Sequence, residues 1–191
     1  MKTIVWDVDD VLNDLMHRWL EDYKAHNPLL SSLKYKHLVK NPPHDILDIS
    51  LDDYLISLDQ FRLDNKKANL VPNQQILSWF HQFGKDFRHL ALTARPKDTV
   101  SILSQWVFEH FGNWIRTVSF IPSSRKGRDL ITYDKSKADF LIWLGKADYF
   151  IDDSPENIQL ASSMGINSLL FPQPWNGFLI PVEEILEKLE P

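Results

Sequence analysis

Apolar residues along this chain follow two patterns that alternate. Short continuous runs of β-branched and aromatic residues are typical of buried strands, and apolar positions three and four residues apart are typical of amphipathic helices. The short runs predict strands near residues 3–6, 87–92, 118–121, 149–151 and 168–171. The helical spacing predicts helices near residues 14–26, 51–61, 76–83, 97–111 and 181–189, and two more after Ser136 and Pro155.

Strands that alternate with helices of this length indicate βαβ units. The expected fold class is therefore α/β, with a doubly wound, mostly parallel sheet. The alternation is interrupted at residues 14–72, a stretch that contains several prolines and predicts a helix behind Ser50 as its N-cap. We expect residues 1–13 and 73–191 to form the α/β core and residues 14–72 to form a small helical module inserted into it.

Composition narrows the classes of partner. The formal net charge of −5 disfavours a nucleic-acid or membrane-surface binder that depends on bulk electrostatics, so a small-molecule partner is expected. The absence of cysteine excludes disulfides, thiolate zinc sites and a cysteine nucleophile. The first apolar run is too short for a signal peptide, and no apolar run reaches the about 18 residues of a membrane span, which favours a soluble, cytoplasmic protein.

Polar residues follow four of the predicted strands. In a parallel sheet the residues after each strand meet at the carboxyl edge, where ligands bind. The four segments begin at Asp7, Thr93, Pro122 and Asp152, and they contain these candidate groups: Asp7, Asp9, Thr93, Ala94, Arg95, Arg125, Lys126, Arg128, Asp152 and Asp153. Carboxylates, a hydroxyl and cations at one edge suit the binding of a phosphoryl group together with a divalent cation.

Asp7 and Asp9 are the most informative pair. Two ionised carboxylates two residues apart on an extended strand repel each other unless a cation or a shared proton intervenes, and Mg²⁺ is the natural cation. The alternative for the Asp7 to Asp10 run is a polar turn that starts a helix. The Asp152 and Asp153 pair before Ser154 and Pro155 has the same alternative, a solvated turn with proline in the first helical position.

The order of these motifs resembles the haloacid dehalogenase (HAD)-like hydrolase superfamily over nearly the whole chain. The resemblance implies that Asp7 is the nucleophile that forms an aspartyl-phosphate. It implies that Asp9 protonates the leaving group and then activates water, with a pKa raised by bound substrate and anionic neighbours. Thr93 would donate a hydrogen bond to the phosphoryl group, and the neutralising lysine maps best to Lys137, with Lys135 and Lys126 as alternatives.

The resemblance also implies a Mg²⁺ cofactor. Its ligands would be the carboxylate of Asp7, the backbone carbonyl of Asp9 and one acid of the later pair, Asp153 in preference to Asp152. The expected metal-binding set is therefore Asp7, Asp9, Asp152 and Asp153, and the expected substrate-binding set is Thr93, Ala94, Arg95 and Lys137. We expect Arg95 to hold either a phosphate or a second anionic group, with an exposed arginine at a helix start as the alternative.

Two features of the sequence indicate which group within this superfamily the chain resembles. The family more often has glycine where this chain has Asp10, and an aspartate pair here, together with the run from Asp152 to Asn157 and the segment 174–176, is similar to deoxyribonucleotidase-like members. Residues 14–72 would be the small helical cap that covers the site.

The expected function is therefore a magnesium-dependent phosphatase acting on a small phosphomonoester, first of all a nucleoside monophosphate. The alternatives are a sugar or other metabolite phosphatase and a catalytically silent binding protein. Membrane binding is not expected, nucleic-acid binding is disfavoured, and the sequence does not indicate an oligomeric state.

Overall fold

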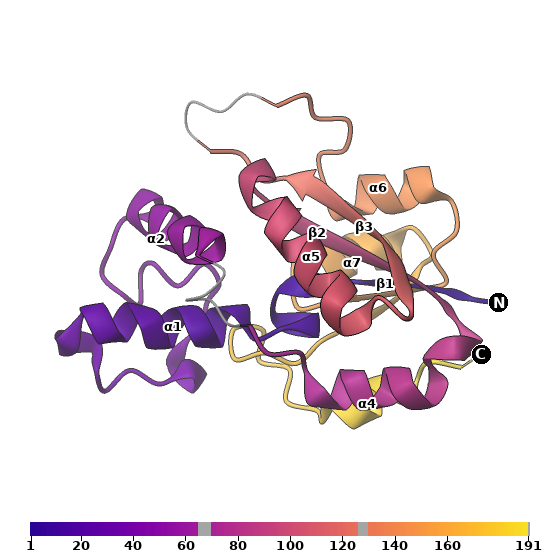
Figure 1. Ribbon diagram of the computed structural model, residues 1–191, viewed down its shortest axis with the longest axis horizontal. Helices are drawn as coiled ribbons and strands as arrows, with labels where there is room; N and C mark the ends of the chain where they lie inside the picture. The colour runs from indigo at the N-terminus through magenta and orange to yellow at the C-terminus, as the bar shows by residue number, and fades with distance from the viewer. Residues whose placement is uncertain (65–69, 126–129, 191) are drawn as a thin grey trace.

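A five-stranded sheet forms the centre of the protein in the computed structural model, which describes residues 1–64, 70–125 and 130–190 (Figure 1). The strands are β1 (Thr3–Trp6), β2 (Arg88–Arg95), β3 (Ile115–Pro122), β4 (Tyr149–Asp152) and β5 (Asn167–Leu170). Their spatial order is β3-β2-β1-β4-β5, and each neighbouring pair is parallel. The prediction of a doubly wound parallel α/β sheet is therefore confirmed.

Helices cover both faces of this sheet because residues along each strand alternate between two hydrophobic clusters. Ile4 and Trp6 of β1 pack with α4 (Gln74–Phe83), α5 (Val100–Phe111) and α8 (Val182–Leu186). Val5, between them, packs on the opposite face with α6 (Lys137–Leu144) and α7 (Pro155–Ser163). This alternation is the period of two that a strand imposes on its side chains.

The segment between β1 and α4 lies beside the sheet as a separate lobe (Figure 1). It contains α1 (Leu15–His26) and α2 (Leu51–Leu63), joined by irregular chain with 3₁₀ turns at Pro28–Leu30 and Tyr35–His37. Ser50 caps α2 as predicted, since its Oγ accepts a hydrogen bond from the Asp53 N–H at 3.0 Å. Buried residues of both helices form a hydrophobic cluster of their own, centred on Trp19, Tyr54 and Phe61. We call this lobe the cap; its assignment as a separate unit, residues 14–72, stays a prediction.

The chain enters and leaves the cap at one place. Asn13 and Pro72 form an isolated antiparallel bridge, and the Val71 N–H donates a hydrogen bond to Asp14 Oδ1 at 2.8 Å. The two connecting segments therefore lie side by side, immediately after the turn that carries Asp7 to Asp10.

Some element bounds differ from the predicted ones. β2 continues to Arg95, three residues beyond the apolar run, and β3 begins at Ile115, three residues before the predicted start. The last helix is shorter than predicted. Trp143, near the end of α6, is 74% exposed. Within the described part of the chain, none of the helices is long and apolar enough to cross a membrane.

We predict that Phe150→Ala destabilises the protein by about 3–5 kcal/mol, because Phe150 is fully buried on a central strand and its truncation leaves a cavity. Trp143→Ala, the control, removes a larger but mostly exposed ring and should cost less than about 1 kcal/mol. Urea unfolding measures both changes in free energy. Equal losses in the two variants would contradict the packing of β4 described above.

Candidate active site

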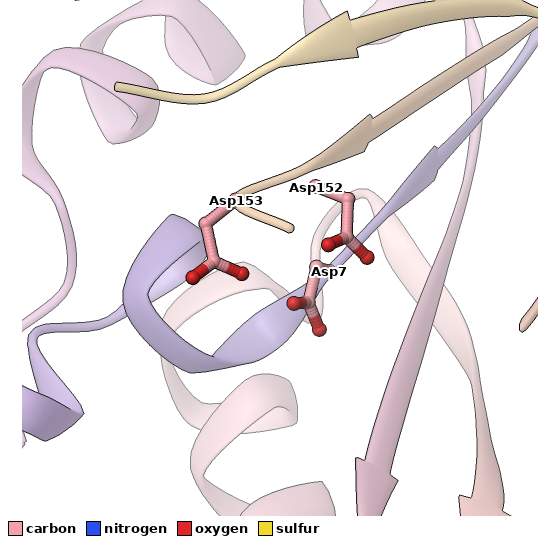
Figure 2. Close-up of side chains that lie close together, drawn as sticks. All are labelled: Asp7, Asp152 and Asp153. Atoms are coloured by element: carbon pink, nitrogen blue, oxygen red, sulfur yellow. The ribbon is translucent and has the colours of Figure 1, made fainter. Parts of the chain in front are cut away.

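The carboxyl ends of β1 and β4 bring three aspartates together. Asp7 follows β1, Asp152 ends β4 and Asp153 comes next, and their carboxyl groups lie close together and extend to the same side (Figure 2). One carboxylate oxygen from each residue lies within 4.8 Å of the other two, and all three residues are buried. The Asp7 N–H donates to the Ile151 carbonyl at 2.8 Å, which continues the β1 to β4 pairing and fixes this arrangement.

Lys137 supplies the positive charge of this cluster. Its Nζ lies 2.7 Å from Asp7 Oδ1 and 2.7 Å from Asp152 Oδ2. Lys137 is the first residue of α6, which begins with a reciprocal capping box between Ser136 and Asp139. Of the alternatives, Lys135 is exposed, and Lys126 lies outside the described residues, as do Gly127 and Arg128. The geometry favours Lys137 as the neutralising lysine.

The two acids of the later motif have different partners. Asp152 is fully buried and accepts hydrogen bonds from Lys137, the Ser154 N–H and the Asn157 side chain. Asp153 lines the cavity described below, and among the described residues its carboxylate accepts a hydrogen bond from Trp175 Nε1 at 2.7 Å. The preference for Asp153 as the metal ligand stays a prediction.

Thr93 brings an unpaired hydroxyl to the same edge. It lies within β2, and its Oγ1 is buried without a hydrogen-bond partner among the described residues. Buried hydroxyls nearly always have a partner, so this one is open to a ligand. Ala94, the next residue, is exposed and also lines the cavity.

Asp9 turns away from the aspartate cluster and pairs with arginines. Its carboxylate accepts two hydrogen bonds from Arg95, at 2.6 and 2.7 Å, and lies 3.2 Å from Nη2 of Arg62. Burial raises the pKa of Asp9, but the two guanidinium groups outweigh it and hold the pKa well below its ordinary value. In this conformation the charges next to Asp9 are cationic, and the raised pKa expected when substrate binds stays a prediction.

Arg95 has a different partner from the predicted phosphate. The side chain is buried on β2, where it forms the bidentate pair with Asp9, and it does not line the cavity. The alternative, an exposed arginine at a helix start, is wrong because β2 includes Arg95 and buries it. Binding of a phosphate or another anionic group by Arg95 stays a prediction.

Sequence reasoning missed Arg62 of α2. This cap residue lines the cavity and contacts Asp9 and, at 3.2 Å, its helical neighbour Asp59. The Asp59 and Arg62 spacing of three residues signalled an ion pair within α2. Nothing local in the sequence indicated that α2 reaches the core.

Asp10 occupies a backbone position that favours glycine. Its φ of 62° is in the left-handed region, which explains why glycine suits this position, although aspartate tolerates it better than most residues. Its N–H donates to Asn13 Oδ1 at 3.1 Å, and its carboxylate accepts from the Met16 N–H at 2.8 Å. Asp10 thus connects the motif directly to the first helix of the cap.

A cavity of about 190 Å³ lies between this edge of the sheet and the cap. The core contributes acidic, basic and hydroxyl groups, and the cap contributes mostly apolar side chains. The core residues are Asp7, Asp9, Asp10, Thr93, Ala94, Lys137, Asp153 and Asn157, and the cap residues are Leu15, Met16, Asn41, Tyr54, Leu58 and Arg62.

The aspartate cluster carries more negative charge than Lys137 neutralises. Burial raises the pKa of Asp7 well above its ordinary value, and Asp152 and Asp153 raise it further against the opposing effect of Lys137. Burial, Asp152 and Asp10 raise the pKa of Asp153 to about 8. Three carboxylates with one ammonium have a net charge of −2 when ionised, and oxygen donors with this charge fit a hard divalent cation.

No known protein-family model matches the sequence, and no curated protein matches it. Solved structures do match its fold. A hydrolase from Streptococcus pneumoniae TIGR4 superposes with a TM-score of 0.57 at 14% identity, over 98% of this chain and 100% of that one. A haloacid dehalogenase-like family hydrolase from Streptococcus pneumoniae gives 0.57 at 15% identity, over 89% of this chain and 84% of that one.

A third match is YfnB from Bacillus subtilis, a candidate HAD hydrolase bound to magnesium. It gives a TM-score of 0.59 at 12% identity, over 94% of this chain and 89% of that one. The chain therefore has the fold of the haloacid dehalogenase-like hydrolases, as the resemblance of its motifs predicted.

We predict that the metal-free protein is less stable at pH 8.5 than at pH 6. Because the pKa of Asp153 in the folded protein is raised to about 8, the folded state keeps a proton that the unfolded state releases near pH 4. Stability is therefore lost as the pH rises from about 4 to about 8. Urea unfolding at several pH values, with a chelator present, measures this slope.

Asp153→Asn should reduce the slope, whereas Glu156→Gln, which removes an exposed charge three residues away, should preserve it. Added Mg²⁺ should stabilise the wild-type protein more at pH 8.5 than at pH 6. A wild-type stability that rises over this pH range would show that the cluster is ionised without a cation.

Proposed function

We propose that the protein is a magnesium-dependent phosphomonoester hydrolase that acts through an aspartyl-phosphate on Asp7. The observation that carries this proposal is the convergence on one cavity of the Asp7 carboxylate, the Lys137 ammonium and the unpaired Thr93 hydroxyl. These are a nucleophile, a neutralising cation and a hydrogen-bond donor, the groups that phosphoryl transfer requires. The likeness to HAD hydrolase structures supports the fold on which this chemistry would take place.

The residues present fit a magnesium ion. Asp7 and Asp153 would hold it through one carboxylate oxygen each, together with the backbone carbonyl of Asp9. Asp152 would orient Lys137 by accepting a hydrogen bond from its Nζ. A bound Mg²⁺ would neutralise charge on the phosphoryl oxygens.

The remaining chemistry belongs to side chains of this chain. A carboxylate oxygen of Asp7 attacks phosphorus as the bond from phosphorus to the leaving-group oxygen breaks, and that oxygen takes a proton from Asp9. Water then attacks the phosphorus of the aspartyl-phosphate and gives a proton to Asp9, while the bond from phosphorus to the Asp7 oxygen breaks, which releases inorganic phosphate and restores the Asp7 carboxylate. Lys137 and Thr93 hold the phosphoryl oxygens in both steps.

The conformation described here suits the second step. Asp9 is paired with Arg95 and Arg62, which keep it a carboxylate able to accept a proton. For the first step Asp9 must carry a proton, so its pairing with at least one arginine must loosen when substrate binds. Since Arg62 belongs to the cap, movement of the cap is the change that would do this.

The size of the cavity bears on the substrate. About 190 Å³ is below the about 300–1,000 Å³ of typical small-molecule pockets, which favours a small phosphorylated metabolite. A nucleoside monophosphate, the substrate first expected, would require the cap to move away from the core. An interdomain movement is described for YfnB, which supports such a motion here.

We predict that the protein releases phosphate from a panel of small phosphomonoesters, nucleotides included, and that release depends on Mg²⁺. Asp7→Asn should lower release by at least about a thousandfold, since the amide is a poor nucleophile of nearly the same size. Asp52→Asn, an exposed change on α2, is the matched control and should retain activity. Binding of these compounds without release from any of them would favour a silent binding protein instead.

Trp175 should set the affinity for the metal. Its indole N–H holds Asp153 Oδ2 at 2.7 Å, and outer-shell contacts of this kind commonly change metal affinity about tenfold or more. We predict that Trp175→Phe weakens Mg²⁺ binding about tenfold in calorimetric titrations, while the exposed Trp143→Phe has no such effect. Unchanged affinity in Trp175→Phe would mean that Asp153 is held in place by other contacts.

A further inference from the structure

Arg62 is the point at which the cap carries a positive charge into the cavity. Its side chain is 9% exposed, with Nη2 at 3.2 Å from Asp9 and Nη1 at 3.2 Å from Asp59. Its Nε is buried and has no acceptor among the described residues. A buried guanidinium N–H without an acceptor destabilises the folded protein. A ligand that accepts a hydrogen bond from Arg62 Nε would therefore supply the interaction that this N–H lacks.

The ion pairs around Arg62 leave one positive charge in excess. Arg95 and Arg62 share Asp9, and Arg62 and Arg125 share Asp59, with Arg125 Nε at 2.6 Å from Asp59. This network of described residues contains three guanidinium groups and two carboxylates. The carboxyl group of Asp10 also lines the cavity, but burial and Asp9 raise its pKa well above its ordinary value, which favours its neutral form. An additional anion would balance the network, whereas a neutral ligand would leave the excess charge uncompensated in a largely buried place.

The position of Arg62 indicates which part of a substrate it meets. The phosphoryl-binding groups, Asp7, Thr93 and Lys137, all belong to the core side of the cavity. Arg62 enters from the cap side, beside Tyr54 and Leu58, which cover whatever lies beyond the phosphoryl group. Its contact with Asp9, the proposed acid, places it next to the leaving group rather than the phosphoryl oxygens.

We propose that Arg62 binds a carboxylate on the leaving group, so that the substrate is a small phosphomonoester with a second acidic group. This inference rests on the proposed function and specifies its substrate class. A carboxylate suits the fork of a guanidinium group, with which it forms paired hydrogen bonds, and it is small enough for a cavity of about 190 Å³. When it binds, Arg62 exchanges part of its contact with Asp9 for the substrate.

Two phosphomonoesters that differ at one end test the proposal. 3-Phosphoglycerate and glycerol 3-phosphate have the same three-carbon skeleton, but the first ends in a carboxylate and the second in a hydroxymethyl group. We expect the wild-type protein to have a KM at least about tenfold lower for 3-phosphoglycerate, since glycerol 3-phosphate lacks the carboxylate that accepts charge-assisted hydrogen bonds from Arg62. Arg62→Met should remove this preference by raising the KM for 3-phosphoglycerate relative to that for glycerol 3-phosphate, whereas any change in kcat through its contact with Asp9 should be the same for both compounds.

Two further variants serve as controls. Arg125→Met disturbs the same ion-pair network from a residue that does not line the cavity, so it should keep the preference. Arg62→Lys keeps the positive charge but lacks the paired N–H donors of the guanidinium group, so it should keep part of the preference. This variant tests the inference even if Arg62→Met folds poorly.

The outcomes separate this inference from the proposed function. If Arg62→Met lowers kcat/KM equally for both compounds, Arg62 serves the phosphoryl group or the fold, and the inference fails while the phosphatase proposal stands. A wild-type protein that hydrolyses both compounds without preference also overturns it. If the protein hydrolyses no phosphomonoester, the proposed function fails; equilibrium titration with both compounds then decides the inference, which stands only if the preference is present and Arg62→Met abolishes it.

Discussion

The structure of the site depends on one buried ammonium group, Lys137 Nζ, held between Asp7 and Asp152. Burial lowers the pKa of Lys137, but Asp152 and Asp7 outweigh it and raise the pKa above its ordinary value, so this charge is permanent. A buried ion pair of this kind contributes little net stability, because desolvation offsets the attraction. Its consequence is chemical: it holds the Asp7 oxygen in place at the end of β1.

Two charge clusters of opposite sign therefore meet at the cavity. The aspartate cluster around Lys137 is negative when its three carboxyl groups are ionised, and the arginine network around Asp9 and Asp59 is positive. The first lies within the core, and the second crosses from the core to α2 of the cap. A ligand with an anionic end on the cap side, and a cation on the core side, would balance both clusters at once.

Much of this site could be predicted because it depends on local patterns. Three local patterns each place one residue at the carboxyl edge of the parallel sheet. The apolar run of β1 places Asp7, the apolar run of β4 places Asp152, and the start of α6 after its N-cap residue, Ser136, places Lys137. The burial of Arg95 could not be predicted because it depends on a partner distant in the sequence, Asp9, which neutralises its charge. Arg62 was missed for the same reason, as its role requires knowing where α2 lies.

Asp10 has an unfavourable backbone conformation but makes a hydrogen bond that connects its loop to the cap. Glycine would adopt this left-handed backbone conformation without strain. Glycine has no side chain, however, so it could not replace the Asp10 carboxylate that accepts a hydrogen bond from the Met16 N–H in the first turn of α1. Asp14, which precedes α1, provides no side-chain cap because its carboxylate accepts the Val71 N–H where the chain leaves the cap. Asp10 therefore takes over the capping of α1, which ties the orientation of the cap helix to the backbone of the motif that carries Asp7 and Asp9. A glycine here would remove that hydrogen bond, so the aspartate couples the position of the cap to the geometry of the loop that carries Asp7 and Asp9.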